Sequence, residues 1–493
     1  MLYSLTVEII SAKKNSKIMK GHTHMSKRDK STTASMDMTT GSIPIKILKF
    51  SIPLMLAQIL EVLFNMSDVA VVGKFSSYEA LGAVGSTSLL VTLFTGFLIG
   101  MGCGVNVRAA QQLGAGQREN VRKTIHTSFL LCLFVGFTAM VLCIAGAKFF
   151  LSLMNTKPEL IDGAVLYFRI YAFGMPAMAV YNFGNAVMSA SGDTKKPLIY
   201  LTFAGIVIYL TFAGIVNVCL NLIFVIGIGM AEDGVAFASI TAQYISAILV
   251  VVNLLRRKDA DVCRLRINEL RFYPGVSKVI LMLGIPAGIQ NAIFAMANLF
   301  IQTGVNSFSA VMVSGNAAAA NADTLIYNVM MAFYTACSSF MGQNMGAHNK
   351  KRMLKSYLIS MAYAFFAAAV LGGLLIIFGR QFLSLFTSEP EVVDAGMQRI
   401  MIMGFSYALS SFMDCTIAAS RGLGKTIVPT IVVIIGSCVF RVAWVYTIFA
   451  YFHTIPSLFL LYPCSWIITA VAEIAYFIHC FRKLAFDKGI SYN

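Results

Sequence analysis

The chain alternates between long apolar stretches and short polar ones. Each apolar stretch is about 20 residues or longer, which is the length an α-helix needs to cross a bilayer. Twelve spans result, at residues 47–72, 84–106, 124–148, 164–188, 197–229, 234–256, 277–304, 315–340, 353–378, 395–419, 426–450 and 458–481. The pattern therefore predicts an all-α, polytopic membrane protein with 12 transmembrane helices.

Short sequence matches relate the first six spans to the last six. Residues 51–53 (SIP) open the first span, and residues 284–286 (GIP) open the seventh, 233 positions later. Residues 111–115 (QQLGA) follow the second span, and residues 343–347 (QNMGA) follow the eighth, 232 positions later. Because six is even, both halves enter from the same side of the membrane. The repeat predicts two six-helix lobes related by a pseudo-two-fold axis along the membrane normal.

The polar segments complete this organisation. Residues 1–42 are polar and basic and are expected to form a disordered tail, and residues 484–493 form a short second tail. The N-lobe is expected at 43–256 and the C-lobe at 277–483, joined by a basic linker at 257–276.

Composition agrees with a membrane protein and limits its partners. The chain is 58% hydrophobic and 12% charged, which is too apolar for a soluble domain. Its net charge of +16 does not indicate a nucleic-acid-binding protein, because the basic residues are dispersed in short loops between the apolar spans. Most of the basic residues lie in segments on the side of the N-terminus, so the positive-inside rule predicts that both termini are cytoplasmic.

Two carboxylates interrupt the first span. Glu61 and Asp68 lie seven residues apart, so two helical turns bring them to one face. An acid at the centre of a membrane helix costs roughly 2.5–3.5 kcal/mol, so such residues usually face a wet cavity and serve ion or proton transfer. The alternative for each is a structural acid that pairs with Arg or Lys of a neighbouring helix.

Other polar side chains lie within apolar spans. Asn217 and Asn221 share one face of the fifth span, and their amides can hydrogen-bond a carboxylate in either protonation state, although ordinary contacts between helices would also use them. In the C-lobe, the candidates that could line a substrate path are Gln290, Asn291, Asn298, Asp414 and Arg441. Asp414 and Arg441 could instead simply pair, and Glu473 is a further acid within a span.

No motif indicates an enzyme, a bound metal or a nucleotide. The ten Cys residues are scattered, with no CxxC pair and no Cys/His cluster at metal-binding spacing. The chain has no GxxxxGK[ST] motif for ATP and no nucleophile elbow. We expect no cofactor other than a coupling ion.

In combination, the motifs resemble those of the multidrug and toxic compound extrusion (MATE) family. They are IPLMLAQ and NMSDVAVVGK in the first span, RAAQQLGAGQ and MGQNMGAHNKKR after the second and eighth, and ASGDTKKP before the fifth. The likeness covers residues 40–483. It implies antiport at the plasma membrane, in which a proton or sodium ion enters while an organic, often cationic, drug leaves. A monomer is expected.

The resemblance also implies roles for single residues. In the family an acid of the first helix couples the ion, and Asp68 stands at the matching position, with the fifth helix beside it. Many relatives have a Glu in the seventh helix, which this chain lacks. A lipid-linked sugar flippase of the same wider superfamily is the alternative, but such a flippase should place several arginines inside the membrane, and here only Arg441 lies deep.

The fifth span contains a perfect tandem repeat. The nonapeptide IYLTFAGIV occurs at 199–207 and again at 208–216. Nine helical residues add roughly 13.5 Å and a net half-turn, so both copies cannot keep one register. We expect the part from Asn217 onward to keep its packed position. The nine additional residues then extend the loop at 192–197 or kink the helix near Gly205 or Gly214.

Overall fold

The computed structural model describes residues 36–75, 78–154, 156–193, 206–387 and 389–484. Only the backbone is described for residues 63–70, 72–75, 78, 79, 81 and 206–213. The described chain is helical and contains no strand, as predicted. Nine of its helices are long and apolar enough to cross a membrane, and ten spans result when the bent pair α5 and α6 counts as one.

Within the described residues, each predicted span overlaps a helical segment. The N-lobe comprises α2 (Ile43–Phe75), α3 (Tyr78–Gly114), α4 (Arg118–Leu153), α5 (Pro158–Ala172), α6 (Met175–Ser191), α8 (Ile206–Asn221), the π-helix η1 (Leu222–Gly227) and α9 (Glu232–Leu255). The C-lobe comprises α10 (Pro274–Asn306), α11 (Ala310–Gly346), α12 (Lys350–Leu383), α13 (Pro390–Gly422), α14 (Ile427–Val433), η3 (Ile434–Val439), α15 (Phe440–Trp444), η4 (Val445–Phe449), α16 (Ala450–Phe452), α17 (Ile455–Phe459) and α18 (Leu461–Lys483). The short 3₁₀-helix η2 (Ile267–Glu269) lies in the linker between the lobes.

Several spans are bent or irregular at positions that the sequence explains. Pro53 and Pro286 lie inside α2 and α10, where each removes a backbone hydrogen bond. The helices α5 and α6 meet at an angle of 45° across residues 173–174, just before Pro176. The fifth span ends in a π-helix, and the eleventh contains two, η3 and η4.

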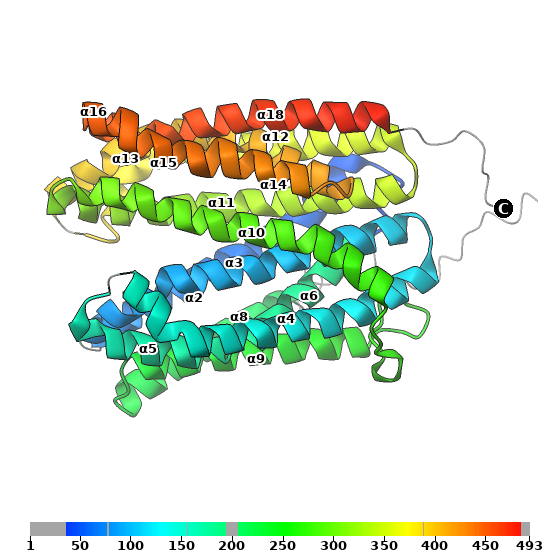
Figure 1. Cartoon of the computed structure of the whole chain (residues 1–493), viewed down its shortest axis with the longest axis horizontal. Helices are drawn as coiled ribbons and strands as arrows, with labels where there is room; N and C mark the ends of the chain where they lie inside the picture. Colours follow the sequence, from blue (N-terminus) through cyan, green and yellow to red (C-terminus); the bar gives the residue numbers. More distant parts are fainter. Residues whose placement is uncertain (1–35, 76–77, 155, 194–205, 388, 485–493) are drawn as a thin grey trace, which may run out of the picture. The chain divides into compact units, whose positions relative to one another are not determined.

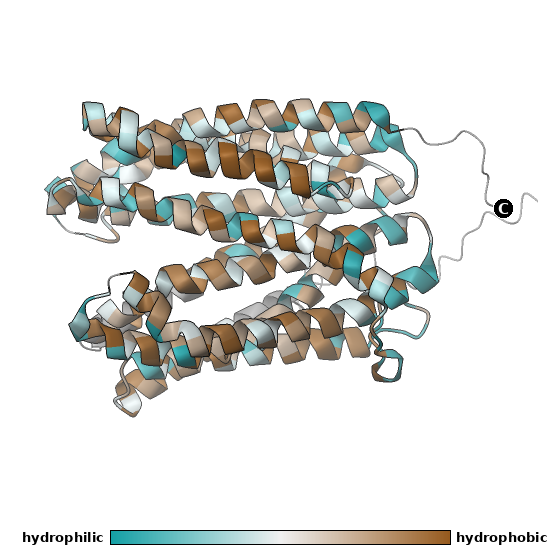
Figure 2. Ribbon diagram, viewed as in Figure 1, coloured by the Kyte–Doolittle hydropathy of each residue, from teal (hydrophilic) through white to brown (hydrophobic). Residues whose placement is uncertain are grey.

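The outer helices of each lobe expose large apolar side chains. Phe134 and Phe149 of α4 are 64% and 66% exposed, and Phe366 and Ile377 of α12 are 63% and 70% exposed. Figure 2 shows hydrophobic residues along the lengths of the helices and hydrophilic residues gathered towards their ends. An apolar surface of this extent fits a lipid environment and not water.

Glycines allow the two lobes to approach closely along α3 and α10, which lie side by side in Figure 1. A Cβ on Gly100 would lie 2.2 Å from the backbone nitrogen of Gly288, and a Cβ on Gly104 would lie 2.7 Å from that of Gly284. Small residues spaced by four positions commonly form such contacts between membrane helices.

Matching contacts relate the two lobes on the linker side, where α3 and α11 end. The Gln111 amide donates to the carbonyl oxygen of Gly422 (3.0 Å), and the Gln343 amide donates to that of Ala190 (2.7 Å). Both members of the second contact lie 232 positions from their counterparts in the first, which is the offset of the sequence repeat. A self-complementary arrangement of this kind is what a two-fold axis produces, so the predicted pseudo-two-fold relation is confirmed.

Residues 36–42, which precede α2, pack against both lobes. The backbone N–H of Met38 donates to the Gln343 Oε1 (3.1 Å), and its carbonyl oxygen accepts from Arg352 (3.0 Å). The N–H of Met36 donates to the carbonyl oxygen of Gly192 (3.3 Å), at the end of α6. Met36 and Met38 are buried, so a disordered tail is the wrong description for residues 36–42, because two apolar side chains find packed surroundings there.

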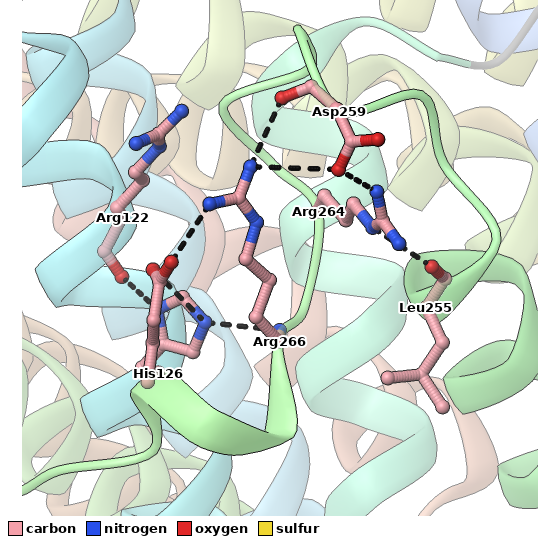
Figure 3. Close-up of polar contacts among 7 residues, drawn as sticks. Arg122, His126, Leu255, Asp259, Arg264 and Arg266 are labelled. Carbon is pink, nitrogen blue, oxygen red and sulfur yellow. Dashed lines mark hydrogen bonds and ion pairs between the residues drawn. The ribbon is translucent and has the colours of Figure 1, made fainter.

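The linker is attached to the N-lobe by a buried ion pair and by a histidine. Arg257 lies 2.7 Å from Asp193, and both side chains are almost completely buried. Figure 3 shows the second attachment: the backbone N–H of Arg266 donates to the Nε2 of His126 (3.0 Å), whose Nδ1 lies 2.7 Å from the carbonyl oxygen of Arg122. The two contacts require a neutral imidazole that carries its proton on Nδ1.

A surface ion pair supports the same turn of the linker. Arg266 donates to the carboxylate of Glu269 (2.7 Å), and this hydrogen bond lowers the pKa of the Glu269 carboxyl. Both side chains are partly exposed, so the pair adds little to stability. The linker is therefore fixed mainly by Arg257 and His126.

The helix that contains the tandem repeat is described only from Ile206, so the predicted changes at 194–205 lie outside the described residues. Within those residues, α8 runs without a break through Gly214 and becomes a π-helix at Leu222. Asn217 and Asn221 are buried, as expected for the part that keeps its packed position.

Candidate functional site

The N-lobe candidates lie on two adjacent helices. Glu61 and Asp68 belong to α2, which packs against α8, and α8 carries Asn217 and Asn221. The side chain of Asp68 lies outside the described part. The two asparagines are 6% and 0% exposed, and each makes polar interactions. This arrangement allows amides of α8 to approach the acidic face of α2.

Glu61 occupies an unusual environment. Its side chain is exposed, and the hydroxyl of Tyr181 on α6 lies within electrostatic range of its carboxyl group. Glu61 therefore lies near a polar group of another helix of the same lobe.

The backbone changes character beside the asparagines. The α-helix ends at Asn221, and the next six residues form the π-helix η1. Such segments alter the direction of side chains within a helix and are frequent at functional sites. The sequence gives no local signal for this change, apart from the repeat that precedes it.

The predicted residues of α10 separate into three environments. Gln290 is buried, and its Oε1 accepts hydrogen bonds from Arg421 of α13 (3.0 Å) and Thr430 of α14 (3.4 Å). Asn291 points to the other lobe, where its amide donates to the carbonyl oxygen of Gly96 (3.0 Å). Asn298 is exposed. Only Gln290 joins a polar cluster within the C-lobe.

That cluster combines two acids and two arginines. Asp414 of α13 lies within electrostatic range of Arg421 and Arg441, and Glu473 of α18 lies within range of Asp414 and Arg421. None of the four forms a salt bridge with another among the described residues. We call Gln290, Asp414, Arg421, Arg441 and Glu473 the C-lobe cluster. The simple Asp414–Arg441 ion pair that the sequence left open is not formed in this structure.

Glu473 is the least satisfied member. It is fully buried, and neither carboxylate oxygen has a hydrogen-bond partner within the described chain. Because an unpaired carboxylate is costly in an apolar environment, such a group favours the protonated form or a bound cation. The sequence identified Glu473 as an acid within a span but gave it no role.

A second network in the C-lobe escaped the sequence analysis. Arg399 of α13 forms a buried ion pair with Asp323 of α11 and also donates to Asn316, while the hydroxyl of Tyr407 donates to Asp323. Arg399 is 5% exposed and Arg441 is 3% exposed. Arg399 is therefore a second buried arginine of the C-lobe. Asp323 within an apolar span was the signal that could have revealed this network.

The described residues include no group of three or more His, Cys, Asp and Glu side chains that could hold a metal ion. The arrangement instead offers single carboxylates beside amides and arginines. Such sites can take up and release a proton or a weakly held cation, and they can contact an organic ion.

Comparisons with known proteins agree with the fold and its repeat. The family model described as MatE matches residues 53–215 and 286–447, so its two matches begin at the two helix prolines, Pro53 and Pro286. The probable multidrug resistance protein YpnP of Bacillus subtilis is 29% identical over 75% of this chain and 80% of its own length. The probable multidrug resistance protein NorM of Thermotoga maritima is 24% identical over 83% of this chain and 86% of its own.

A solved structure shows the same architecture. It is titled as the outward-facing conformation of a multidrug resistance MATE family transporter of the MOP superfamily. It aligns with a TM-score of 0.83 at 20% identity, over 92% of this chain and 99% of the other. At this identity the likeness establishes the fold.

Proposed function

The chain belongs to the MatE family, and we propose that it is a secondary active transporter that exports organic, often cationic, compounds in exchange for protons or sodium ions. The observation that carries the proposal is the packing of α2, with Glu61 and Asp68, against the buried amides of α8. A membrane helix retains two acids on one face only where they have a task or a partner.

In this proposal Asp68 binds the coupling ion, and Glu61 assists from two turns away. The amides of Asn217 and Asn221 hydrogen-bond the carboxylate whether or not it is protonated, because an amide both donates and accepts. Substrate contacts come from the C-lobe cluster, with Asn298 at an exposed position of α10. The transporter needs no cofactor beyond the coupling ion.

The two-fold arrangement suggests how access alternates. The lobes touch on the linker side through a few hydrogen bonds and through glycines, so that side can open by rocking of one lobe against the other. We propose that the linker side is cytoplasmic, with both termini there, and that the described state faces outward. The basic linker supports this orientation, and we place a monomer in the plasma membrane.

The flippase alternative gains one argument and loses another. Arg399, Arg421 and Arg441 all lie on helices of the C-lobe, which supplies the arginines that such a flippase would need. Each lies near a carboxylate, from Asp323, Asp414 or Glu473. A site for pyrophosphate should have an excess of positive charge, which this balance does not supply.

The test is transport by the purified full chain in liposomes. We expect a fluorescent organic cation to move when an inward proton or sodium gradient is imposed, and the two gradients applied separately identify the coupling ion. Asp68→Asn should abolish gradient-driven movement while the protein still folds, because the amide cannot exchange a proton. Glu61→Gln should shift the pH dependence of transport and not remove it.

Asp162→Asn is the matched control, because Asp162 is exposed near the start of α5. It should transport at the parent rate. Parent-rate transport by Asp68→Asn would remove Asp68 from the mechanism, and an absence of movement in the parent under both gradients would contradict antiport itself.

A further inference from the structure

Three aromatic rings surround the guanidinium group of Arg441. Its central carbon lies 4.7 Å from the ring centre of Tyr462, 5.5 Å from that of Phe294 and 6.0 Å from that of Trp466. We call these three rings the aromatic cage. Phe294 comes from α10, and the other two rings come from α18, so the cage joins two helices of the C-lobe.

Arg441 is buried but lacks the partner that a buried cation normally has. Its Nε donates to the Ser465 Oγ (3.0 Å), and no carboxylate forms a salt bridge with it among the described residues. Arg399 provides the comparison: it also lies against Tyr462, at 6.0 Å, but Asp323 neutralises it. The rings therefore supply much of the stabilisation of Arg441, through attraction between the cation and the faces of the rings.

The backbone beside Arg441 is suited to movement. Arg441 lies in α15, a helix of five residues between the π-helices η3 and η4. A π-helix replaces the regular hydrogen-bond pattern with a wider and weaker one, so the short helix between two of them can rotate at low cost. Asp414, within electrostatic range of Arg441, provides an alternative partner after such a rotation.

We propose that the aromatic cage is a binding site for an organic cation, and that Arg441 occupies it as an internal competitor. Rings in this arrangement recognise quaternary ammonium and guanidinium groups, because the ring faces attract the positive charge and also contact the apolar surface of the cation. The substrate enters when Arg441 swings towards Asp414. This inference rests on the proposed transport of organic cations and identifies where their charged group binds.

The competition gives a physical reason for exchange. An ionised Asp414 attracts Arg441 and vacates the cage, whereas a protonated Asp414 leaves Arg441 between the rings. The charged and titratable groups around Asp414 are Arg421 of the same helix, Glu473 of α18, and Tyr327 and Tyr334 of α11. Binding of an organic cation and protonation of Asp414 therefore exclude each other, which is the condition that antiport requires.

Tryptophan fluorescence can test the cage directly. The chain has only two Trp residues, so a Trp444→Phe background leaves Trp466 as the single reporter. The purified full chain is titrated with choline chloride, with its uncharged isostere 3,3-dimethyl-1-butanol, and with sodium chloride at equal ionic strength. We expect a saturable change with choline alone.

Variants then distinguish a cage from a general apolar contact. Arg441→Gln should tighten choline binding about tenfold, because the competitor is gone, and Tyr462→Leu should weaken it about tenfold. Ser465→Ala removes the hydrogen bond that holds Arg441, together with the one that Ser465 donates to the carbonyl oxygen of Tyr462 (2.8 Å). It should tighten binding by a smaller factor and serves if Arg441→Gln does not fold. Phe459→Leu, at a ring that lies against Arg399, is the matched control and should change nothing.

The inference is overturned if the uncharged isostere gives the same signal, or if neither Arg441→Gln nor Ser465→Ala binds choline more tightly than the parent. The assay uses no ion gradient, so its failure leaves the proposed antiport standing. Conversely, a loss of gradient-driven transport in liposomes would not affect binding to the cage.

Discussion

Asn106 of α3 and Ser339 of α11 hydrogen-bond to each other across the two lobes, at 3.1 and 3.3 Å, and they lie 233 positions apart. The repeat offset in this part of α3 and α11 is 232, as in the Gln111 and Gln343 pair, so Ser339 directly follows Ser338, the counterpart of Asn106. Residues at matching places in the two lobes can touch only close to the symmetry axis, so the axis runs near these two side chains. The contact identifies the centre of the interface between the lobes.

Gln111 and Gln343, which occupy matching positions in the two lobes, should contribute differently to the free energy of unfolding. Gln111 makes one contact between the lobes, whereas Gln343 makes the equivalent contact and also accepts from the backbone of Met38. We expect Gln111→Ala to lower the free energy of unfolding by about 1 kcal/mol and Gln343→Ala by about 2 kcal/mol. Thermal unfolding of the two purified variants compares them, and equal losses would mean that residues 36–42 add no stability.

Removing one partner of the buried Asp323–Arg399 ion pair should lower the free energy of unfolding. Asp323→Asn leaves Arg399 without its counter-charge, so we expect a loss of about 3 kcal/mol in the free energy of unfolding. Replacing both residues, as Asp323→Leu with Arg399→Met, should restore most of this loss, because no charge then remains buried. Melting temperatures measured in one detergent decide it, and a double variant no more stable than Asp323→Asn would contradict the explanation.

Replacing Glu473 by an apolar residue should raise the stability of the protein and lower its transport rate. Its carboxylate is fully buried without a hydrogen-bond partner in the described chain, so Glu473→Leu should raise the free energy of unfolding by about 1–3 kcal/mol. The same change should slow cation transport, because a titratable group of the C-lobe cluster is lost. Glu473→Gln, with the same shape and an unsatisfied polar group, is the control and should gain little stability. A less stable Glu473→Leu variant would show that the carboxylate is satisfied.

The second copy of the tandem repeat should be dispensable. Residues 206–227 form α8 and η1, which are long enough to cross the apolar layer at 1.5 Å per residue. After the deletion, the identical copy at 199–207 can take the place of 208–216 in this span. We expect deletion of 208–216 to give a protein that is at least as stable and still active. Melting temperature and efflux of the deletion variant provide the measurement, and a folded but inactive variant would show that the longer segment is needed for transport.

The architecture was predictable because its signals are local. Apolar length sets the spans, and the repeated motifs around Pro53 and Pro286 set the two lobes. The boundaries were less accurate: α13 continues to Gly422, so Arg421, assigned by hydropathy to a loop, lies on a helix and contacts Gln290.

The polar networks were harder to predict, for a physical reason. Asp323 and Arg399 are 76 positions apart and meet only because α11 packs against α13. A single sequence contains no information on which face of one helix meets which face of another. The rings around Arg441 were equally hidden, because an aromatic residue in a membrane span has many structural uses.

The attachment of the linker has a mechanical consequence. A free chain of the linker's length could extend by roughly 3.3 Å per residue and would let the lobes separate widely. Here Arg257 and His126 hold the linker against the N-lobe. The segment that remains to connect the N-lobe to α10 is therefore the short stretch at Tyr273 and Pro274. The connection between the lobes is therefore short and allows little separation by itself. Any large displacement must be absorbed by α10 itself, and its interior proline, Pro286, is the place where that helix can flex.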